Sequence, residues 1–154
     1  MNDQNMPVVE CQMMIRKPIA EVFQAFINPE ITTKFWFTKS SGALEENKSI
    51  TWEWEMYNVQ AEVIVKEIIP NKQITIEWGE PKTTVVFDFT SLSDDSTYAV
   101  IKNFGFQEKG NELIEAIKNN TGGFTTVLDG LKSYLEHGIE LNLVRDKFPH
   151  INQK

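Results

Sequence analysis

The sequence is poor in cysteine and in basic charge, and these shortages exclude several classes of protein. Its single cysteine, Cys11, cannot form an intrachain disulfide, which fits a cytoplasmic protein. Its 15 Lys and Arg residues are outnumbered by 22 Asp and Glu residues, giving a net charge of −7 without any basic cluster. Because nucleic acids and anionic membranes are bound through clustered basic side chains, we expect neither as a partner.

Long apolar runs and sorting signals are missing as well. No apolar stretch approaches the length of a membrane span. The first residues contain no basic region followed by an apolar block, which is the pattern of a signal peptide. We therefore expect a cytoplasmic protein whose residues 1–154 form one domain.

Motifs for catalysis, cofactors and metals are the third shortage. The sequence has no glycine-rich phosphate loop, nucleophile elbow or dinucleotide fingerprint. Neither His137 nor His150 has a carboxylate or thiol at the spacing of a zinc site. Cys11 falls on an apolar strand face, where a small buried residue is expected. We therefore predict no catalytic residue, no cofactor and no metal, and we favour a binding protein over an enzyme.

The centre of the chain consists of strand-like segments joined by short polar turns. Residues 49–57 alternate strictly, with Ile50, Trp52, Trp54 and Met56 on one face. Similar patterns cover residues 59–69, 73–78, 83–92 and 97–104, after a first strand at 8–16 and a weak one at 40–45. Because no helix separates the successive strands, this pattern predicts an antiparallel meander with one covered face.

Helical patterns flank these strands. Pro18 starts a short amphipathic helix, and Asn28-Pro29 starts a second one over residues 29–36. A helical segment at residues 112–118 precedes a long amphipathic helix over residues 119–138. The economical way to bury both apolar surfaces is an α+β fold. We predict a curved antiparallel sheet of about six or seven strands wrapped around the long C-terminal helix, with two short helices after the first strand.

Four stretches together resemble a known family. They are IRKPIAEVFQAFINPEITTKFW at residues 15–36, AEVIVKEIIPNKQITIEW at 61–78, TTVVFDFTSLSDDSTYAVIKNFGF at 83–106 and NNTGGFTTVLDGLKSYLEHG at 119–138. They resemble the START-like (SRPBCC, helix-grip) superfamily, and within it the bacterial relatives of the activator of the ninety-kilodalton heat-shock chaperone ATPase. One departure is Phe124 after Gly123, where the family usually has tryptophan. The resemblance implies a hydrophobic cavity between the sheet and the long helix.

Apolar side chains of the strands and of the long helix are the candidates for a ligand-binding wall. Ligand pockets are mostly apolar and aromatic, and the resemblance implies such a pocket, whereas the alternating pattern by itself predicts a filled core. Both interpretations stay open for the same side chains. The candidates are Trp52, Trp54, Met56, Trp78, Phe87, Phe89, Phe124, Val127, Leu131 and Tyr134.

Two further features have alternative interpretations. The pair Gly122-Gly123 either opens a pocket mouth and allows close packing, or breaks the helical region into two helices. Glu53 and Glu55 share a strand face, and paired carboxylates can act as acid and base when burial shifts one of them. Because they alternate with tryptophans, we expect them to face water. Weaker candidates of the same kind are Glu62, Asp88 and Tyr98.

Three functional hypotheses follow from the resemblance and from the missing motifs. The first is binding of a small hydrophobic or aromatic ligand, such as a lipid, a sterol or a polyketide-like molecule, between the sheet and the helix. The second is a module that regulates a chaperone ATPase or binds another protein. The third is a cyclase or hydrolase, which needs an ionisable residue with a perturbed pKa inside the cavity. The first is the one that we expect.

Overall fold

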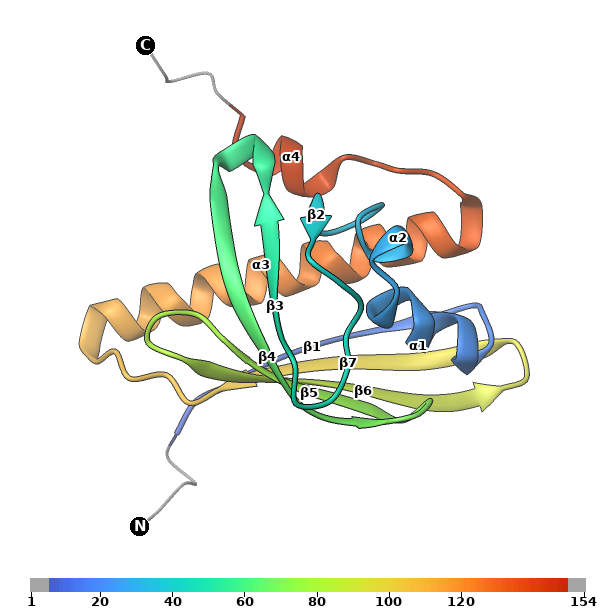
Figure 1. The fold of residues 1–154 in the computed structure, drawn as a ribbon, viewed down its shortest axis with the longest axis horizontal. Coiled ribbons are helices and arrows are strands. Elements are labelled where there is room, and N and C mark those ends of the chain that lie inside the picture. Colours follow the sequence, from blue (N-terminus) through green and yellow to red (C-terminus); the bar gives the residue numbers. More distant parts are fainter. Residues whose placement is uncertain (1–5, 150–154) are drawn as a thin grey trace.

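The computed structural model describes residues 6–149, which form a curved antiparallel sheet, one long helix and several short helices (Figure 1). The seven strands lie in the order β1-β7-β6-β5-β4-β3-β2. The strands are β1 (Val8–Ile15), β2 (Lys39–Ser40), β3 (Ser49–Trp54), β4 (Val59–Ile69), β5 (Gln73–Trp78), β6 (Thr83–Ser93) and β7 (Ser96–Phe104). The helices are α1 (Ile19–Ile27), α2 (Pro29–Thr32), the 3-10 helix η2 (Glu55–Tyr57), α3 (Gly110–His137) and α4 (Leu143–Lys147). The predicted helix-grip fold is thereby confirmed.

The sheet bends mainly where β4 and β3 follow β5. Figure 1 shows β3 and the start of β4 rising steeply from the strands β5, β6 and β7. The pairing of β4 with β5 shifts between Val65 and Glu67, and such a bulge bends a strand and increases its twist. The concave face carries the apolar half of the alternating pattern. Its fully buried members include Val63, Val65, Ile74, Ile76, Val85, Phe87 and Ile101.

The helical region near the C-terminus is one continuous helix, α3. The interpretation of Gly122-Gly123 as a break between two helices is therefore wrong. Leu113 before the glycine pair and Phe124 after it both belong to the hydrophobic core or pack against it. Burial on both sides outweighs the cost of about 1 kcal/mol for each glycine in a helix. Within residues 6–149, no helix is long and apolar enough to cross a membrane.

The helix lies close to a neighbouring segment at Gly130, which is buried. A Cβ atom at this position would lie 3.2 Å from both the Cβ and the carbonyl oxygen of Phe35. Phe35 follows α2 and packs edge-on against Phe26 of α1, with ring centroids 5.7 Å apart. Close packing of the helix thus depends on Gly130, which is not among the candidate wall residues predicted for this helix.

Several predicted elements are shorter in the structure. The strand predicted over residues 49–57 ends at Trp54, because residues 55–57 turn as η2. Asn58 closes this turn with a φ of 55°, a left-handed conformation that asparagine tolerates better than most residues. The second helix stops at Thr32 instead of residue 36, and the weak strand at 40–45 reduces to Lys39–Ser40.

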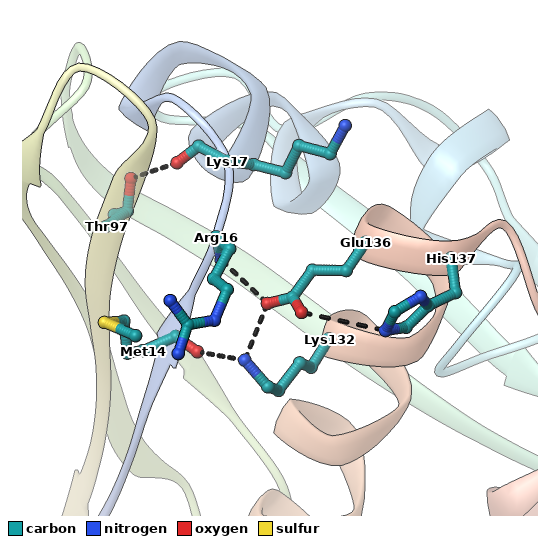
Figure 2. Close-up of polar contacts among 7 residues, drawn as sticks. All are labelled: Met14, Arg16, Lys17, Thr97, Lys132, Glu136 and His137. Carbon is teal, nitrogen blue, oxygen red and sulfur yellow. Dashed lines mark hydrogen bonds and ion pairs between the residues drawn. The ribbon is translucent and has the colours of Figure 1, made fainter.

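A polar contact anchors the end of α3 to the end of β1 (Figure 2). The Glu136 carboxylate accepts hydrogen bonds from the backbone N–H of Arg16 at 2.7 Å and from Lys132 Nζ at 2.6 Å. Lys132 Nζ also donates to the carbonyl oxygen of Met14 at 2.9 Å. The Glu136 side chain is only 8% exposed. Burial alone raises the pKa of Glu136, but the hydrogen bonds from Lys132 and Arg16, with the charges of Lys132 and His137, outweigh burial and lower that pKa overall.

We expect Glu136→Gln to lower the free energy of unfolding at pH 7 by about 1–2 kcal/mol, since it removes a buried carboxylate with charge-assisted hydrogen bonds. A carboxyl group whose pKa is lowered by folding stabilises the protein above its ordinary pKa of about 4.3. That contribution is lost as the pH falls through the lowered pKa of the folded state. The difference between wild type and variant, measured by urea unfolding, should therefore shrink towards pH 3.

The matched control for this prediction is Glu115→Gln on the same helix. Glu115 pairs with Lys118 at 3.2 Å, but both side chains are at least 60% exposed. Exposed ion pairs contribute roughly 0–1 kcal/mol, so we expect a smaller loss. Equal losses in the two variants, or a Glu136→Gln loss that stays constant with pH, would contradict the anchoring role.

Candidate functional site

An apolar pocket of about 540 Å³ lies between the sheet and α3. Trp54 and Trp78 line it from the sheet, and Phe124 and Val127 line it from α3. The turn at residues 79–81 and the short helix α4 form the rest of its rim. Ligand pockets of roughly 300–1,000 Å³ with mostly apolar walls are typical of small-molecule sites.

Aromatic rings form the continuous part of the pocket wall. The ring centroid of Trp78 lies 5.8 Å from that of Phe124, 5.8 Å from that of Trp36 and 6.2 Å from that of Trp54. Trp36 and Phe124 are buried, whereas Trp54 and Trp78 are half-buried. The two half-buried indole rings therefore keep apolar surface available to a bound molecule.

Four of the ten candidate side chains lie in the filled core, outside the lining of this pocket. Trp52 stacks on Phe37 with ring centroids 4.4 Å apart and planes at 17°. Phe87 packs on Phe26 at 5.1 Å. Phe89 and Leu131 are also buried, with at most 4% of their surface exposed.

Two other candidates, Met56 and Tyr134, lie neither in this core nor in the pocket lined by Trp54 and Trp78. Met56 is carried away from the strand face by η2 and lines a smaller hollow of about 110 Å³, together with Gly130. Tyr134 is half-buried on α3 and lines neither this hollow nor the aromatic pocket. Of the ten candidates, the structure therefore brings Trp54, Trp78, Phe124 and Val127 together in the aromatic pocket.

The two glycines of the pair in α3 point in different directions. Gly123 lines the pocket, and apart from its adjacent residues and the backbone of its own helix, no described heavy atom lies within 4 Å of a Cβ built there. A Cβ at Gly122 would instead meet Lys147 Nζ of α4 at 3.5 Å. The missing side chain of Gly123 thus widens the pocket, in agreement with the proposed mouth.

The C-terminal segment is held over the pocket by Tyr57 of η2. Its hydroxyl donates towards the carbonyl oxygens of Val144 and, at 3.0 Å, of Arg145, and it accepts from the N–H of Phe148 at 3.3 Å. Val144, Lys147 and Phe148 all line the pocket. Figure 1 shows α4 beside the connection between β3 and β4, where η2 lies. This side of the site could not be predicted from the sequence, because nothing in the pattern of residues 55–57 links them to α4.

We expect Tyr57→Phe to loosen this segment, because it removes the hydroxyl that contacts three backbone groups of the C-terminal segment. Hydrogen exchange of the amides at residues 143–148 should accelerate, while the free energy of global unfolding falls by about 1 kcal/mol. Tyr98→Phe is the control, since Tyr98 is 39% exposed and lies outside the pocket lining. Unchanged exchange in α4 of the Tyr57 variant would show that the hydroxyl does not hold the segment.

The polar candidates of the sequence analysis lie outside the pocket lining. They are Cys11, Glu53, Glu55, Glu62, Asp88, Tyr98 and His137. Cys11 is buried and makes 3.5 Å contacts with the carbonyl oxygen of Thr121 and with Thr125 Oγ1. His150 falls outside the described residues. Across residues 6–149, no group of three His, Cys, Asp or Glu side chains is placed to hold a metal ion.

Comparison with known proteins gives matches to a family and to solved structures. Residues 16–136 match the family described as Activator of Hsp90 ATPase homolog 1-like protein. The protein SSP2350 from Staphylococcus saprophyticus is 26% identical, with a TM-score of 0.76 over 88% of this chain and 96% of that one. The Aha1 dimer from Colwellia psychrerythraea is 19% identical, with a TM-score of 0.73 over 86% and 98%.

A third similar structure is DynU16, a protein of the dynemicin biosynthetic locus. It is 17% identical, with a TM-score of 0.77 over 86% of this chain and 48% of that one. At these identities, the Colwellia and DynU16 structures show a shared fold. Comparison with functionally curated proteins finds no significant match.

Proposed function

The chain belongs to the Activator of Hsp90 ATPase homolog 1-like family, and we propose that it binds a small hydrophobic or aromatic ligand in the pocket between the sheet and α3. The family match confirms the resemblance derived from the four stretches of sequence. The observation that carries the proposal is the aromatic pocket itself, with Trp54 and Trp78 half-buried at its wall. The candidate ligands are those expected from the sequence: a lipid, a sterol or a polyketide-like molecule.

The energetics of the pocket support this function. A core gains stability when apolar surfaces meet without voids, and a cavity costs roughly 24 cal/mol for each Å³ left unfilled. Here Trp36 and Phe124 pack closely, while neighbouring apolar surface of Trp54 and Trp78 stays partly uncovered. A ligand that covers these rings removes apolar area from water at about 25 cal/mol per Å². Burial of these two indole rings therefore favours the binding of an apolar ligand.

The similar fold of DynU16 is consistent with a small organic ligand, since that protein comes from a biosynthetic locus. The match to the Aha1 dimer of Colwellia supports a second candidate, regulation of a chaperone ATPase or binding of another protein. A pull-down that recovers a chaperone, together with a changed chaperone ATPase rate, would favour this second function.

Ligand binding is tested on natively purified protein. Denaturation, extraction and mass spectrometry should release a hydrophobic molecule, and a thermal-shift screen of lipids and aromatic compounds should raise the melting temperature. Quenching of tryptophan fluorescence would report occupancy near Trp54 and Trp78. Protein that yields no extractable molecule, gains no stability from any compound and shows unchanged fluorescence would overturn the proposal.

A further inference from the structure

We propose that Glu108 orients the bound molecule, so that the ligand carries a hydroxyl or amino hydrogen-bond donor on its apolar body and is not a carboxylate. This inference rests on the proposed ligand binding and names the chemical class of the ligand. It assigns a specificity role to the end of the pocket formed by the junction of β7 and α3.

The first observation is a pair of buried oxygen atoms that lack partners. Within the described residues, Glu108 Oε1 and Asn103 Oδ1 are buried and accept no hydrogen bond. Asn103 lies near the end of β7, and Glu108 lies in the linker between β7 and α3. A buried acceptor without a donor is destabilising, and such groups in folded proteins are usually satisfied by a partner. Asn103 lies outside the pocket lining, whereas Glu108 lines the pocket. The unmatched oxygen of Glu108 therefore points to a donor supplied by a molecule in the pocket.

The second observation places this junction at the pocket. Asn103 Nδ2 donates to Thr83 Oγ1 and to the carbonyl oxygen of Thr84, each at 2.9 Å, and Thr83 lines the pocket. Gly105 then turns the chain with a φ of 91°, and a Cβ there would lie 3.9 Å from Thr83 Cα. The backbone therefore runs closely past Thr83 before it reaches Glu108, which also lines the pocket.

The third observation is the sign of the charges around the pocket. Its ionisable lining side chains are Glu80, Glu108, Tyr57 and Lys147. The ammonium of Lys147 lies 5.9 Å from the ring centroid of Phe148, at the α4 side of the rim. A ligand carboxylate directed at Glu108 would bring two negative charges together in a chain whose net charge is already −7. A hydroxyl or ammonium group instead donates to the unmatched oxygen.

Equilibrium dialysis with four probes that share one aromatic body tests this inference. The probes are naphthalene, 2-naphthol, 2-naphthylmethylamine and 2-naphthoate. Because a hydrogen bond to a charged acceptor strengthens binding, we expect the two donor-bearing probes to bind the wild-type protein about tenfold more tightly than naphthalene. The carboxylate should bind less tightly than naphthalene.

The same dialysis on Glu108→Gln assigns the preference to a residue. The advantage of the two donor-bearing probes over naphthalene should fall about three- to tenfold, and 2-naphthoate should gain affinity, because the amide can donate to it. Glu112→Gln is the control, since Glu112 is an exposed carboxylate in the first turn of α3 and outside the pocket lining. It removes the same charge near the same junction and should preserve the order of affinities.

Each outcome distinguishes this inference from the proposed function. Equal affinities for the four probes, or tightest binding of 2-naphthoate, would overturn the inference while ligand binding stands. An equal effect of Glu108→Gln and Glu112→Gln would also overturn it, since net charge and not a local contact would then set the preference. If none of the probes bound at all, this inference would be overturned, because no donor-bearing aromatic molecule would then be bound at Glu108, while the proposed function would still be decided by the extraction and thermal-shift experiments. Should Glu108→Gln fail to fold by circular dichroism, the order of the wild-type affinities still decides.

Discussion

Gly130→Leu is expected to lower the free energy of unfolding by about 3 kcal/mol, the upper part of the range for overpacking a core. Helix propensity alone predicts the opposite sign, since leucine is about 0.8 kcal/mol more favourable than glycine inside a helix. Steric contact decides, because the first added carbon already lies 3.2 Å from the Phe35 Cβ and carbonyl oxygen. A carbonyl oxygen is part of the backbone and cannot move aside by changing a rotamer.

The reason that Phe35 cannot yield is its own packing. Its side chain is 6% exposed, and its ring meets Phe26 edge-on at 5.7 Å. A shift of Phe35 would therefore be transmitted to α1, whose buried face rests on β6 and β7. Inserting leucine at Gly130 would therefore disturb both α3 and α1, the helices that pack on the sheet.

Urea unfolding followed by circular dichroism measures this effect. Gly123→Ala is the matched control on the same helix, because its added carbon meets nothing within 4 Å among the described residues. Removal of a helical glycine without steric contact should raise the free energy of unfolding by about 0.5–1 kcal/mol. Two variants of the same helix should thus change stability in opposite directions. A Gly130→Leu variant as stable as wild type would show that α3 does not approach Phe35 this closely.

The sheet could be predicted because its information is local. Alternation of apolar residues determines which face of β4 to β7 is buried. Polar turns, such as those at Asn71 and at Ser93–Ser96, determine where one strand ends and the next begins. The same pattern predicted a strand that is too long after Trp54, because alternation continues through Met56 but the backbone turns as η2. A period-two pattern shows which side chains share a face only while the backbone stays extended.

The pocket could not be separated from the core by the same means. Trp52 and Trp54 are two residues apart on one strand and have identical side chains, so any pattern treats them alike. In the structure Phe37 covers Trp52, leaving 2% of it exposed, whereas Trp54 lines the pocket. The difference arises from which distant segment packs above each ring. The position of Glu108 at the pocket could not be predicted for the same reason. Glu108 lies in an irregular linker, and only the fold brings this linker to Thr83.

Gly123→Leu is expected to weaken binding of an aromatic probe such as 2-naphthol by at least about tenfold, a loss of about 1.4 kcal/mol. The new side chain enters the space that the bound molecule would occupy, because Gly123 lines the pocket and a Cβ there meets no described atom within 4 Å. The same substitution removes a glycine from the helix interior, so the free energy of unfolding should rise by about 0.5–1 kcal/mol. Lost binding would therefore not result from lost folding.

Gly122→Leu provides the matched comparison, and the two are measured together by equilibrium dialysis and urea unfolding. Gly122 is adjacent in the sequence and has the same helical environment, but it is outside the pocket lining, and its Cβ would meet the flexible end of Lys147 at 3.5 Å. Its affinity for 2-naphthol should stay within about threefold of wild type, a difference of less than 1 kcal/mol. If both variants bound the probe like wild type, the molecule would occupy another part of the protein. If both lost binding equally, a general change in α3 and not filling of the pocket would be responsible, because only Gly123 of the pair lines the pocket.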